Sequence, residues 1–211
     1  GGNEQNTTQN RSGVNYAQYS KVQLDFRTYN KLVGRAQLAT RIILGGALAY
    51  GNSSEVPFIK QFSAGGANSI RAFNARSLGP GSFESTNDST IILDETGDIK
   101  IEVSVEHRFP IVGVLKGAFF TDAGNVWLLN AREEKPGGEF GRDFLNEFAI
   151  GAGTGLRLDF SFFLLRFDLA FPIRNPSLPD GERWTIMDIN PLNRSWRRDN
   201  LLLNIAIGFP F

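Results

Sequence analysis

The sequence has one histidine, His107, and no cysteine, so few side chains could support nucleophilic catalysis. A hydrolase that uses histidine as its base needs a serine nucleophile within hydrogen-bonding distance. In "IKIEVSVEHRF" (99–109), His107 shares a face of the expected strand with Val105 and Phe109, whereas Ser104 lies on the opposite face. The residues therefore favour a structural or interfacial histidine, and the sequence predicts no enzyme.

Cofactor and metal sites are not indicated either. The segment "GGANSIR" (65–71) lacks the Gly-Lys-Ser/Thr ending that gives a phosphate loop its charge and its metal ligand. The acidic residues between 88 and 98 lack the spacing of a calcium loop. Lys and Arg number 22, as do Asp and Glu, so no global charge points to nucleic acid. We therefore expect no metal, no cofactor and no nucleic-acid partner.

One arginine stands out, because Arg71 lies between large apolar residues in a loop. The segment "FSAGGANSIRAFNARSLGPGSF" (62–83) is rich in glycine, proline and small polar residues, which favour turns. It belongs to a connection, 51–97, that is much longer than most loops. A guanidinium can bind a carboxylate through paired, charge-assisted hydrogen bonds. From these residues alone, Arg71 is either a solvated loop residue or half of an internal ion pair.

Apolar residues alternate with period two along most of the chain, which predicts strands. Most of the expected strands are longer than those of ordinary sheets and reach the roughly 10 residues that cross a membrane as a tilted strand. The seven expected strands are 19–31, 35–50, 98–109, 112–127, 146–159, 161–172 and 200–211. Tight turns near 32–34, 110–111 and 160 alternate with long loops at 51–97, 128–145 and 173–199, an arrangement typical of outer-membrane barrels.

The alternation does not say which face points inward. A soluble barrel buries its apolar face, whereas a membrane barrel turns that face to lipid and its charges to the lumen. Strand length, loop alternation and the final Phe211 favour an all-β, transmembrane antiparallel barrel in the outer membrane, in contact with outer-membrane lipids. Residues 1–18 form a polar loop or tail, and 19–211 the barrel portion. The expected lumen charges are Glu102, Glu106, Arg157, Arg166 and Asp168.

Five segments, in order, resemble the BamA/TamA outer-membrane assembly family of bacterial surface antigens. "SIRAFNARSLGPGSF" resembles its loop-six signature, whose core is Val/Ile-Arg-Gly-Phe/Tyr, although Ala72 replaces the usual glycine. "FFTDAGNVW" contains its Phe-x-Asp-x-Gly motif. "GAGTGLRLDF" and "LLRFDLAFPI" resemble its next two strands, and "NIAIGFPF" its aromatic end. The resemblance covers nearly all of residues 35–211.

The resemblance implies that loop 51–97 folds into the lumen, where a latch holds it. In this latch Arg71 pairs with Asp122 beside Phe120. The residues of the implied latch are Arg71, Phe73, Phe120, Asp122 and Gly124. The family has a sixteen-stranded barrel with this loop between strands eleven and twelve, so the seven strands correspond to strands ten to sixteen. The missing N-terminal strands, or a second chain, are then expected to pair with the two open edges.

The implied function is the assembly, insertion or translocation of nascent outer-membrane proteins, without catalysis. The family mechanism uses a weak seam at the last strand, which corresponds here to Gly208, Pro210 and Phe211. Pro210 has no amide N–H for the ladder, so it either weakens the seam or merely ends the sheet. The alternative function is a passive, porin-like pore, for which a charged lumen would suffice.

Overall fold

The computed structural model describes residues 16–84, 95–160 and 162–211. Residues 1–15, most of the expected polar tail, lie outside the described part of the chain. The same holds for 85–94, within the long loop, and for residue 161.

The strands form one antiparallel sheet in chain order, which confirms the predicted seven-stranded topology. The strands are β1 (Tyr19–Lys31), β2 (Gln37–Ala49), β3 (Ile99–Val112), β4 (Leu115–Trp127), β5 (Ala149–Phe160), β6 (Phe163–Arg174) and β7 (Leu202–Ile207). The short helices are η1 (Phe58–Lys60), η2 (Phe144–Glu147), η3 (Ile186–Asp188) and α1 (Arg194–Asn200). None of the described helices has the length and apolarity to cross a membrane.

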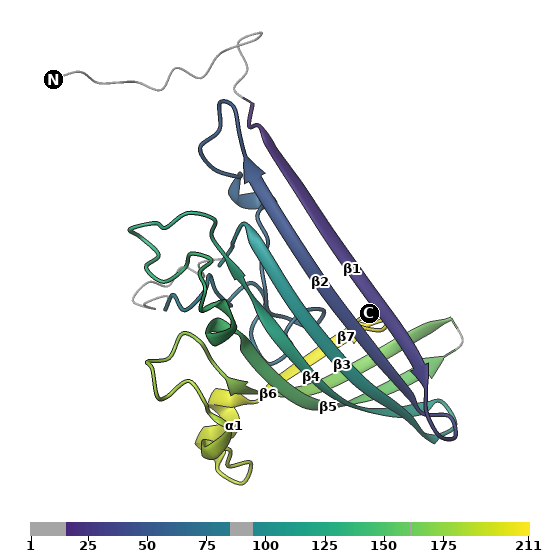
Figure 1. Cartoon of the computed structure of the whole chain (residues 1–211). Coiled ribbons are helices and arrows are strands. Elements are labelled where there is room, and N and C mark those ends of the chain that lie inside the picture. The colour runs from purple at the N-terminus through teal and green to yellow at the C-terminus, as the bar shows by residue number, and fades with distance from the viewer. Residues whose placement is uncertain (1–15, 85–94, 161) are drawn as a thin grey trace, which may run out of the picture.

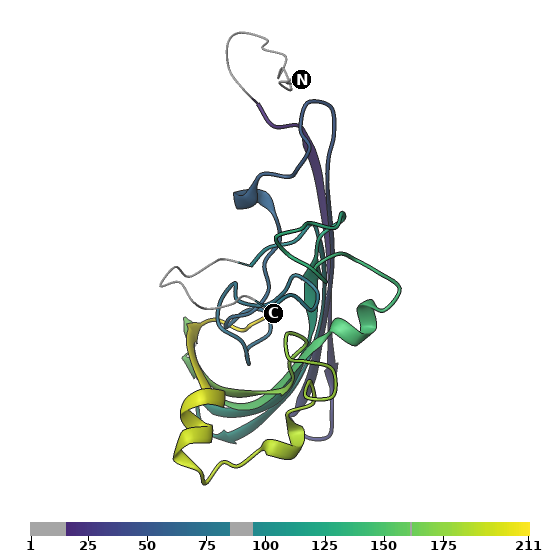
Figure 2. The same ribbon diagram turned by 90° about the vertical axis from the view of Figure 1, so that its left-hand side faces the viewer.

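The sheet curves strongly and leaves a concave side (Figure 1). Figure 2 shows that the chain between β2 and β3 lies within this curve rather than outside it. Tight turns join β1 to β2, β3 to β4 and β5 to β6, whereas the other connections are long, as predicted. Among the described residues, β1 and β7 each pair with one strand only, so the sheet is open at both edges.

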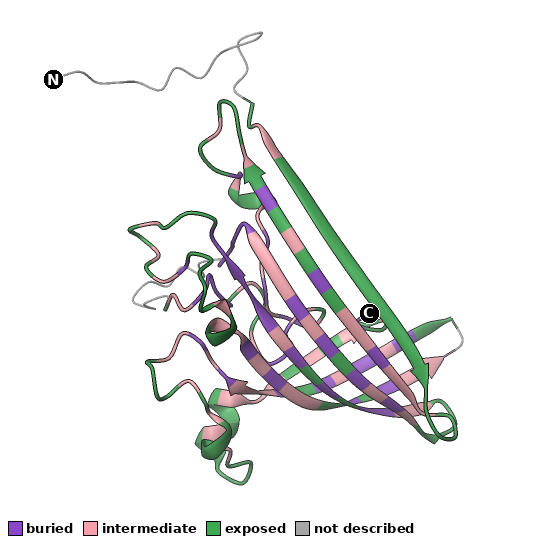
Figure 3. Cartoon of the chain, viewed as in Figure 1, coloured by how far each residue is buried: buried purple, intermediate pink, exposed green. Residues whose placement is uncertain are grey.

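The two faces of the sheet differ in polarity, and the convex face is the apolar one. Buried and more exposed residues alternate along the central strands (Figure 3). On β3, Glu102, Glu106 and Arg108 are buried, while Val105 between them is 37% exposed. Exposed apolar side chains such as Phe119 continue the convex face on β4. A soluble sandwich would bury these apolar residues, so the pattern is that of a membrane barrel.

The prediction for the last strand is wrong at both of its ends. Residues up to Asn200 belong to α1, and β7 stops at Ile207. Gly208 follows with φ of +87°, a conformation that glycine adopts readily, and Pro210 cannot donate a ladder hydrogen bond. Phe211, which the prediction places in the last strand, is only 6% exposed and lies outside the ladder. The chain therefore turns away from the ladder after six paired residues.

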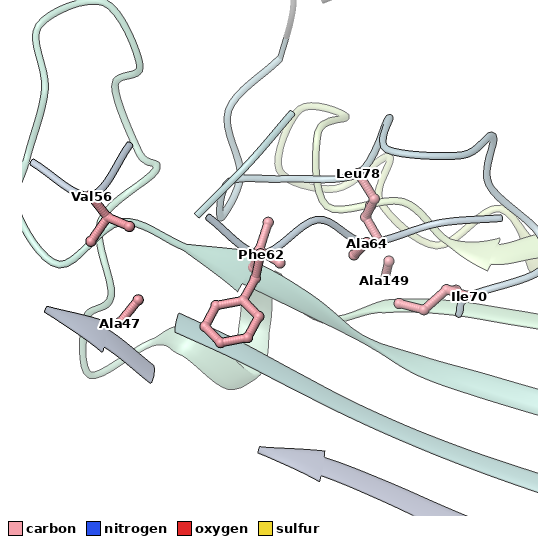
Figure 4. Close-up of a cluster of buried hydrophobic side chains, with 8 residues drawn as sticks. Ala47, Val56, Phe62, Ala64, Ile70, Leu78 and Ala149 are labelled. Carbon is pink, nitrogen blue, oxygen red and sulfur yellow. The ribbon is translucent and has the colours of Figure 1, made fainter. Parts of the chain in front are cut away.

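A small apolar core lies between the long β2–β3 connection and the sheet. Figure 4 shows that its side chains come from both: Phe62, Ala64, Ile70 and Leu78 from the connection, and Ala47 and Ala149 from the ends of strands. Phe62 lies against Gly45 on β2, where a Cβ would come within 2.7 Å of the ring. Burial of these side chains fixes the connection on the concave face and places Arg71, next to Ile70, over β4.

Candidate functional site

Arg71 is fully buried, and the structure brings it together with Asp122 on β4. Arg71 Nε donates to Asp122 Oδ2 at 2.7 Å, and Nη2 donates to Oδ1 at 2.8 Å. The backbone N–H of Arg71 also donates to Oδ2, at 3.2 Å. This is the two-pronged geometry that a planar guanidinium offers and a lysine cannot reproduce.

The remaining face and edge of the guanidinium are also occupied. Nη1 donates to Glu106 Oε2 at 2.6 Å, and the Phe120 ring lies beneath, 3.5 Å from Cζ to the ring centroid. Burial lowers the pKa of Arg71, but Asp122 and then Glu106 outweigh it, so the pKa stands above its usual value. Arg71 therefore remains charged at every physiological pH.

Two arginines of the barrel wall complete a buried charge network. Arg157 Nη2 donates to Glu106 Oε2 at 3.1 Å, and its Nη1 donates to Asp168. Arg166 Nη1 lies 3.4 Å from Asp168 Oδ2. We use the term charge network for Arg71, Glu106, Asp122, Arg157, Arg166 and Asp168. Three cations face three carboxylates within this set, and Arg108 lies beside it, with Nε donating to Glu106 Oε1 at 2.8 Å.

The network also holds the loop through its backbone. Arg166 Nη2 donates to Ala67 O at 2.9 Å and to Asn68 Oδ1 at 2.7 Å. Glu102, the fifth expected lumen charge, lies outside the network: it accepts a hydrogen bond from Ser69 and lies 3.0 Å from Lys100 Nζ. All five predicted lumen charges are thus buried on the concave face.

The other two residues expected at the latch do not touch the guanidinium. Phe73 is half-buried and packs between the two apolar clusters of the loop and the wall. Gly124 lies opposite Glu102 in the β3–β4 ladder, and a Cβ there would collide with the carbonyl oxygen of Ile101. Phe73 therefore anchors the loop by packing, and Gly124 allows the two strands to approach.

Glycines on β5 make room for the loop, a feature that the sequence analysis missed. A Cβ at Gly151 would overlap the methyl group of Ala72, and one at Gly153 would overlap the Phe120 ring. The sequence contains a pattern that indicates this space, because "GAGTG" places Gly151, Gly153 and Gly155 at period two on one face of the strand. Ala72, the departure from the family signature, is thus accommodated by a missing side chain on the wall.

Side chains of the wall also bind the C-terminal segment. Arg108 Nη2 donates to Phe211 O at 3.2 Å, and Arg41 Nη1 lies within hydrogen-bonding distance of Pro210 O at 3.4 Å. Asn204 on β7 donates to Arg71 O at 2.9 Å. Of the expected seam residues, Pro210 and Phe211 therefore lie against the concave face, and Gly208 supplies the turn.

The long strands, their apolar convex face and the loop buried on a charged concave face define the class of protein: this is part of an integral β-barrel of the outer membrane. A family model described as the Omp85 superfamily domain matches residues 2–186. The chain therefore belongs to the Omp85 superfamily.

Two similar proteins are longer than this chain. The chain is 25% identical over 166 residues to the outer membrane protein assembly factor BamA of Neisseria meningitidis serogroup B, covering 68% of this chain and 20% of that protein. It also resembles the crystal structure of BamA from Haemophilus ducreyi lacking POTRA domains 1–3. The TM-score is 0.60 and the identity 22%, over 90% of this chain and 35% of that one. The chain thus spans about a fifth of the first relative and about a third of the second.

Proposed function

We propose that this chain is the C-terminal barrel portion of a non-enzymatic factor that inserts nascent outer-membrane proteins or translocates polypeptides. The similarity to an assembly factor suggests the class of function. In this proposal the concave face lines the lumen of a barrel that the missing N-terminal strands complete. Loop 51–97 then lies inside the lumen, where the Arg71–Asp122 pair acts as its latch.

The observation that carries the proposal is the burial of Arg71 by carboxylates of two neighbouring strands. Asp122 on β4 and Glu106 on β3 are 1% and 0% exposed, and both bind the same guanidinium. A porin needs charges that face a water-filled channel. Here the wall charges bind the loop instead, which supports a plugged lumen over an open pore.

The end of β7 supports a weak seam at this edge. β7 pairs with β6 over six residues, Leu202–Ile207 against Leu165–Ala170, whereas β1 and β2 pair over thirteen. β7 offers only six residues for pairing at its free edge, and a ladder with fewer cross-strand contacts opens at lower cost. We propose that this edge opens laterally to an incoming strand and that Gly208 and Pro210 limit its length.

The functional test compares Arg71→Ala with wild type in the full-length protein, in two assays. In lipid vesicles we expect the variant to insert an unfolded outer-membrane barrel more slowly. In planar bilayers we expect it to conduct more ions, because the loop no longer fills the lumen. Arg132→Gln is the matched control and should behave as wild type. It removes an arginine that lies outside the charge network and pairs with Glu55 at 3.1 Å.

A passive pore gives the opposite pattern. Wild type would then conduct freely, and conductance would respond to Arg166→Gln or Glu106→Gln, while client insertion would be absent in wild type and variants alike. That result would replace the assembly function with the pore.

A further inference from the structure

We infer that the concave face carries a second site, a basic cavity that binds carboxylates of an acidic polypeptide segment. The cavity lies at the end of the sheet with the tight turns. Its lining residues are Arg35, Gln37, Arg108, Phe109, Pro110, Gly113, Lys116, Arg157 and Phe209. This inference goes beyond the proposed function, since an assembly factor and a pore could both contain such a site.

The cavity is large enough for one or two acidic side chains. Its volume is about 270 Å³. A water molecule occupies about 30 Å³ in the liquid, so the cavity corresponds to roughly nine waters. The turns before β2 and between β3 and β4, the wall strand β5 and the C-terminal segment all contribute to its lining.

Its charge is one-sided. Four of the lining residues are cations, and none is an aspartate or glutamate. Three of the cations already have carboxylate partners nearby: Arg108 binds Glu106 at 2.8 Å and Lys116 binds Asp159 at 2.5 Å, while Arg157 belongs to the charge network. Arg35 lies in the exposed turn, and within the described part of the chain its guanidinium makes no ion pair or hydrogen bond.

A buried donor gives a second, independent indication of a ligand. Arg157 is 0% exposed and lines the cavity, and its Nε has no hydrogen-bond acceptor among the described residues. A buried N–H of a charged group without an acceptor is costly, so such donors usually have a partner when the protein is at work. An entering carboxylate would meet Arg35 at the mouth, and it would reach Arg157 Nε only after the side chains that cover this atom move.

A polypeptide fits this position better than a lipid headgroup. Three of the cavity's cations, Arg108, Lys116 and Arg157, belong to the concave face, whereas the apolar surface for acyl chains is the convex one, with Phe119 57% exposed. A lipid would have to withdraw its chains from the bilayer to place its phosphate here. Phe209 and Pro110 add apolar walls beside the charges, which suits peptide side chains rather than a bare ion.

The test measures fluorescence anisotropy of a fluorescein-labelled, C-terminally amidated peptide with three consecutive glutamates. The full-length protein is folded in detergent micelles. We expect saturable binding that weakens with salt, and none with the matched glutamine peptide. Arg35→Gln should weaken binding by about tenfold, the loss of one charge-assisted hydrogen bond. Lys31→Gln removes a cation from the same hairpin, outside the cavity, and should leave binding unchanged.

Several results would overturn the inference. Equal weakening by Arg35→Gln and Lys31→Gln would indicate general attraction to this end of the barrel. Binding of inorganic phosphate without the peptide, or of vesicles with anionic lipid only, would identify another ligand. Lys116→Gln provides a second variant, and full peptide affinity in both Arg35→Gln and Lys116→Gln would exclude the cavity.

Discussion

Replacing Arg71 by alanine should release loop 51–97 from the concave face while the strands stay folded. The substitution leaves the Asp122 carboxylate 1% exposed and without its two guanidinium bonds, and it removes the 2.6 Å bond to Glu106. Glu106 keeps Arg108 and Arg157 as partners. Asp122 keeps only the backbone N–H of residue 71 among these donors, so most of the cost falls on it.

The expected magnitude follows from the burial of the pair. Removing one partner of a buried ion pair costs about 3–5 kcal/mol. At about 1.4 kcal/mol per factor of ten, the docked state loses between roughly a hundredfold and several thousandfold in population relative to the undocked state. An exposed pair is worth only about 0.2–1 kcal/mol. Arg27→Ala, at an arginine whose side chain is 44% exposed beside Asp25, is therefore the matched control.

Hydrogen–deuterium exchange of peptides from 62–83, in the full-length protein, measures this release. We expect faster exchange there in Arg71→Ala, unchanged exchange in β3 and β4, and no effect of Arg27→Ala. In Arg71→Ala/Asp122→Ala the orphaned carboxylate is gone, so the double variant should lose less than the sum of the single losses. Wild-type protection of 62–83 in Arg71→Ala, or simple additivity in the double variant, would refute a buried pair that holds the loop.

Two further predictions concern the fit of the loop and one of its neighbours. Gly151→Ala should destabilise the docked loop by about 1–3 kcal/mol, because the added methyl group overlaps that of Ala72. Adding Ala72→Gly to this variant should restore the protection of 62–83 from hydrogen exchange, and failure of that rescue would contradict the overlap. Glu147 Oε2 accepts a hydrogen bond from Trp127 Nε1 at 2.5 Å, and burial raises the pKa of the Glu147 carboxyl. The contribution of Glu147 to the free energy of unfolding is therefore full below the ordinary glutamate pKa and is lost as pH rises through the raised pKa. Glu147→Gln should therefore gain thermal stability relative to wild type as pH increases, measured by tryptophan fluorescence, and a constant difference between the two proteins would argue against it.

Much of the fold follows from local pattern. Period-two alternation gives six of the seven strands to within a few residues, because a strand with one face in lipid and one on a charged interior repeats its chemistry at every second position. The last strand was predicted to be longer than it is. Its alternation continues through Phe209 and Phe211, but Gly208 takes a positive φ and Pro210 cannot join the ladder, and neither effect appears in a hydropathy pattern.

The site is also predictable only in part. The Arg71–Asp122 pair follows from the resemblance to the family, because each residue occupies a recognisable position in a family motif. Tertiary packing decides the rest. Asn204 comes from β7, far from the loop in sequence, and Arg41 on β2 donates to Asn68 O of the loop at 3.1 Å; both contacts depend on how the loop folds back over the strands. Gly151, Gly153 and Gly155 were visible as a stripe, but only the position of Ala72 and Phe120 explains why side chains are absent there.

The charge network links the loop and the wall in a way that single pairs would not. Arg71 binds two strands at once, and Arg157 binds Glu106 while also reaching Asp168 on β6. Every carboxylate therefore has a wall arginine or a loop arginine beside it, and removal of the loop leaves Asp122 without a guanidinium partner, whereas Glu106 keeps Arg108 and Arg157. That unpaired carboxylate, within a low-dielectric interior, favours return of the loop. Arg71 is the one loop side chain in the charge network, so the ion pairs of the loop with Asp122 and Glu106 form and break together.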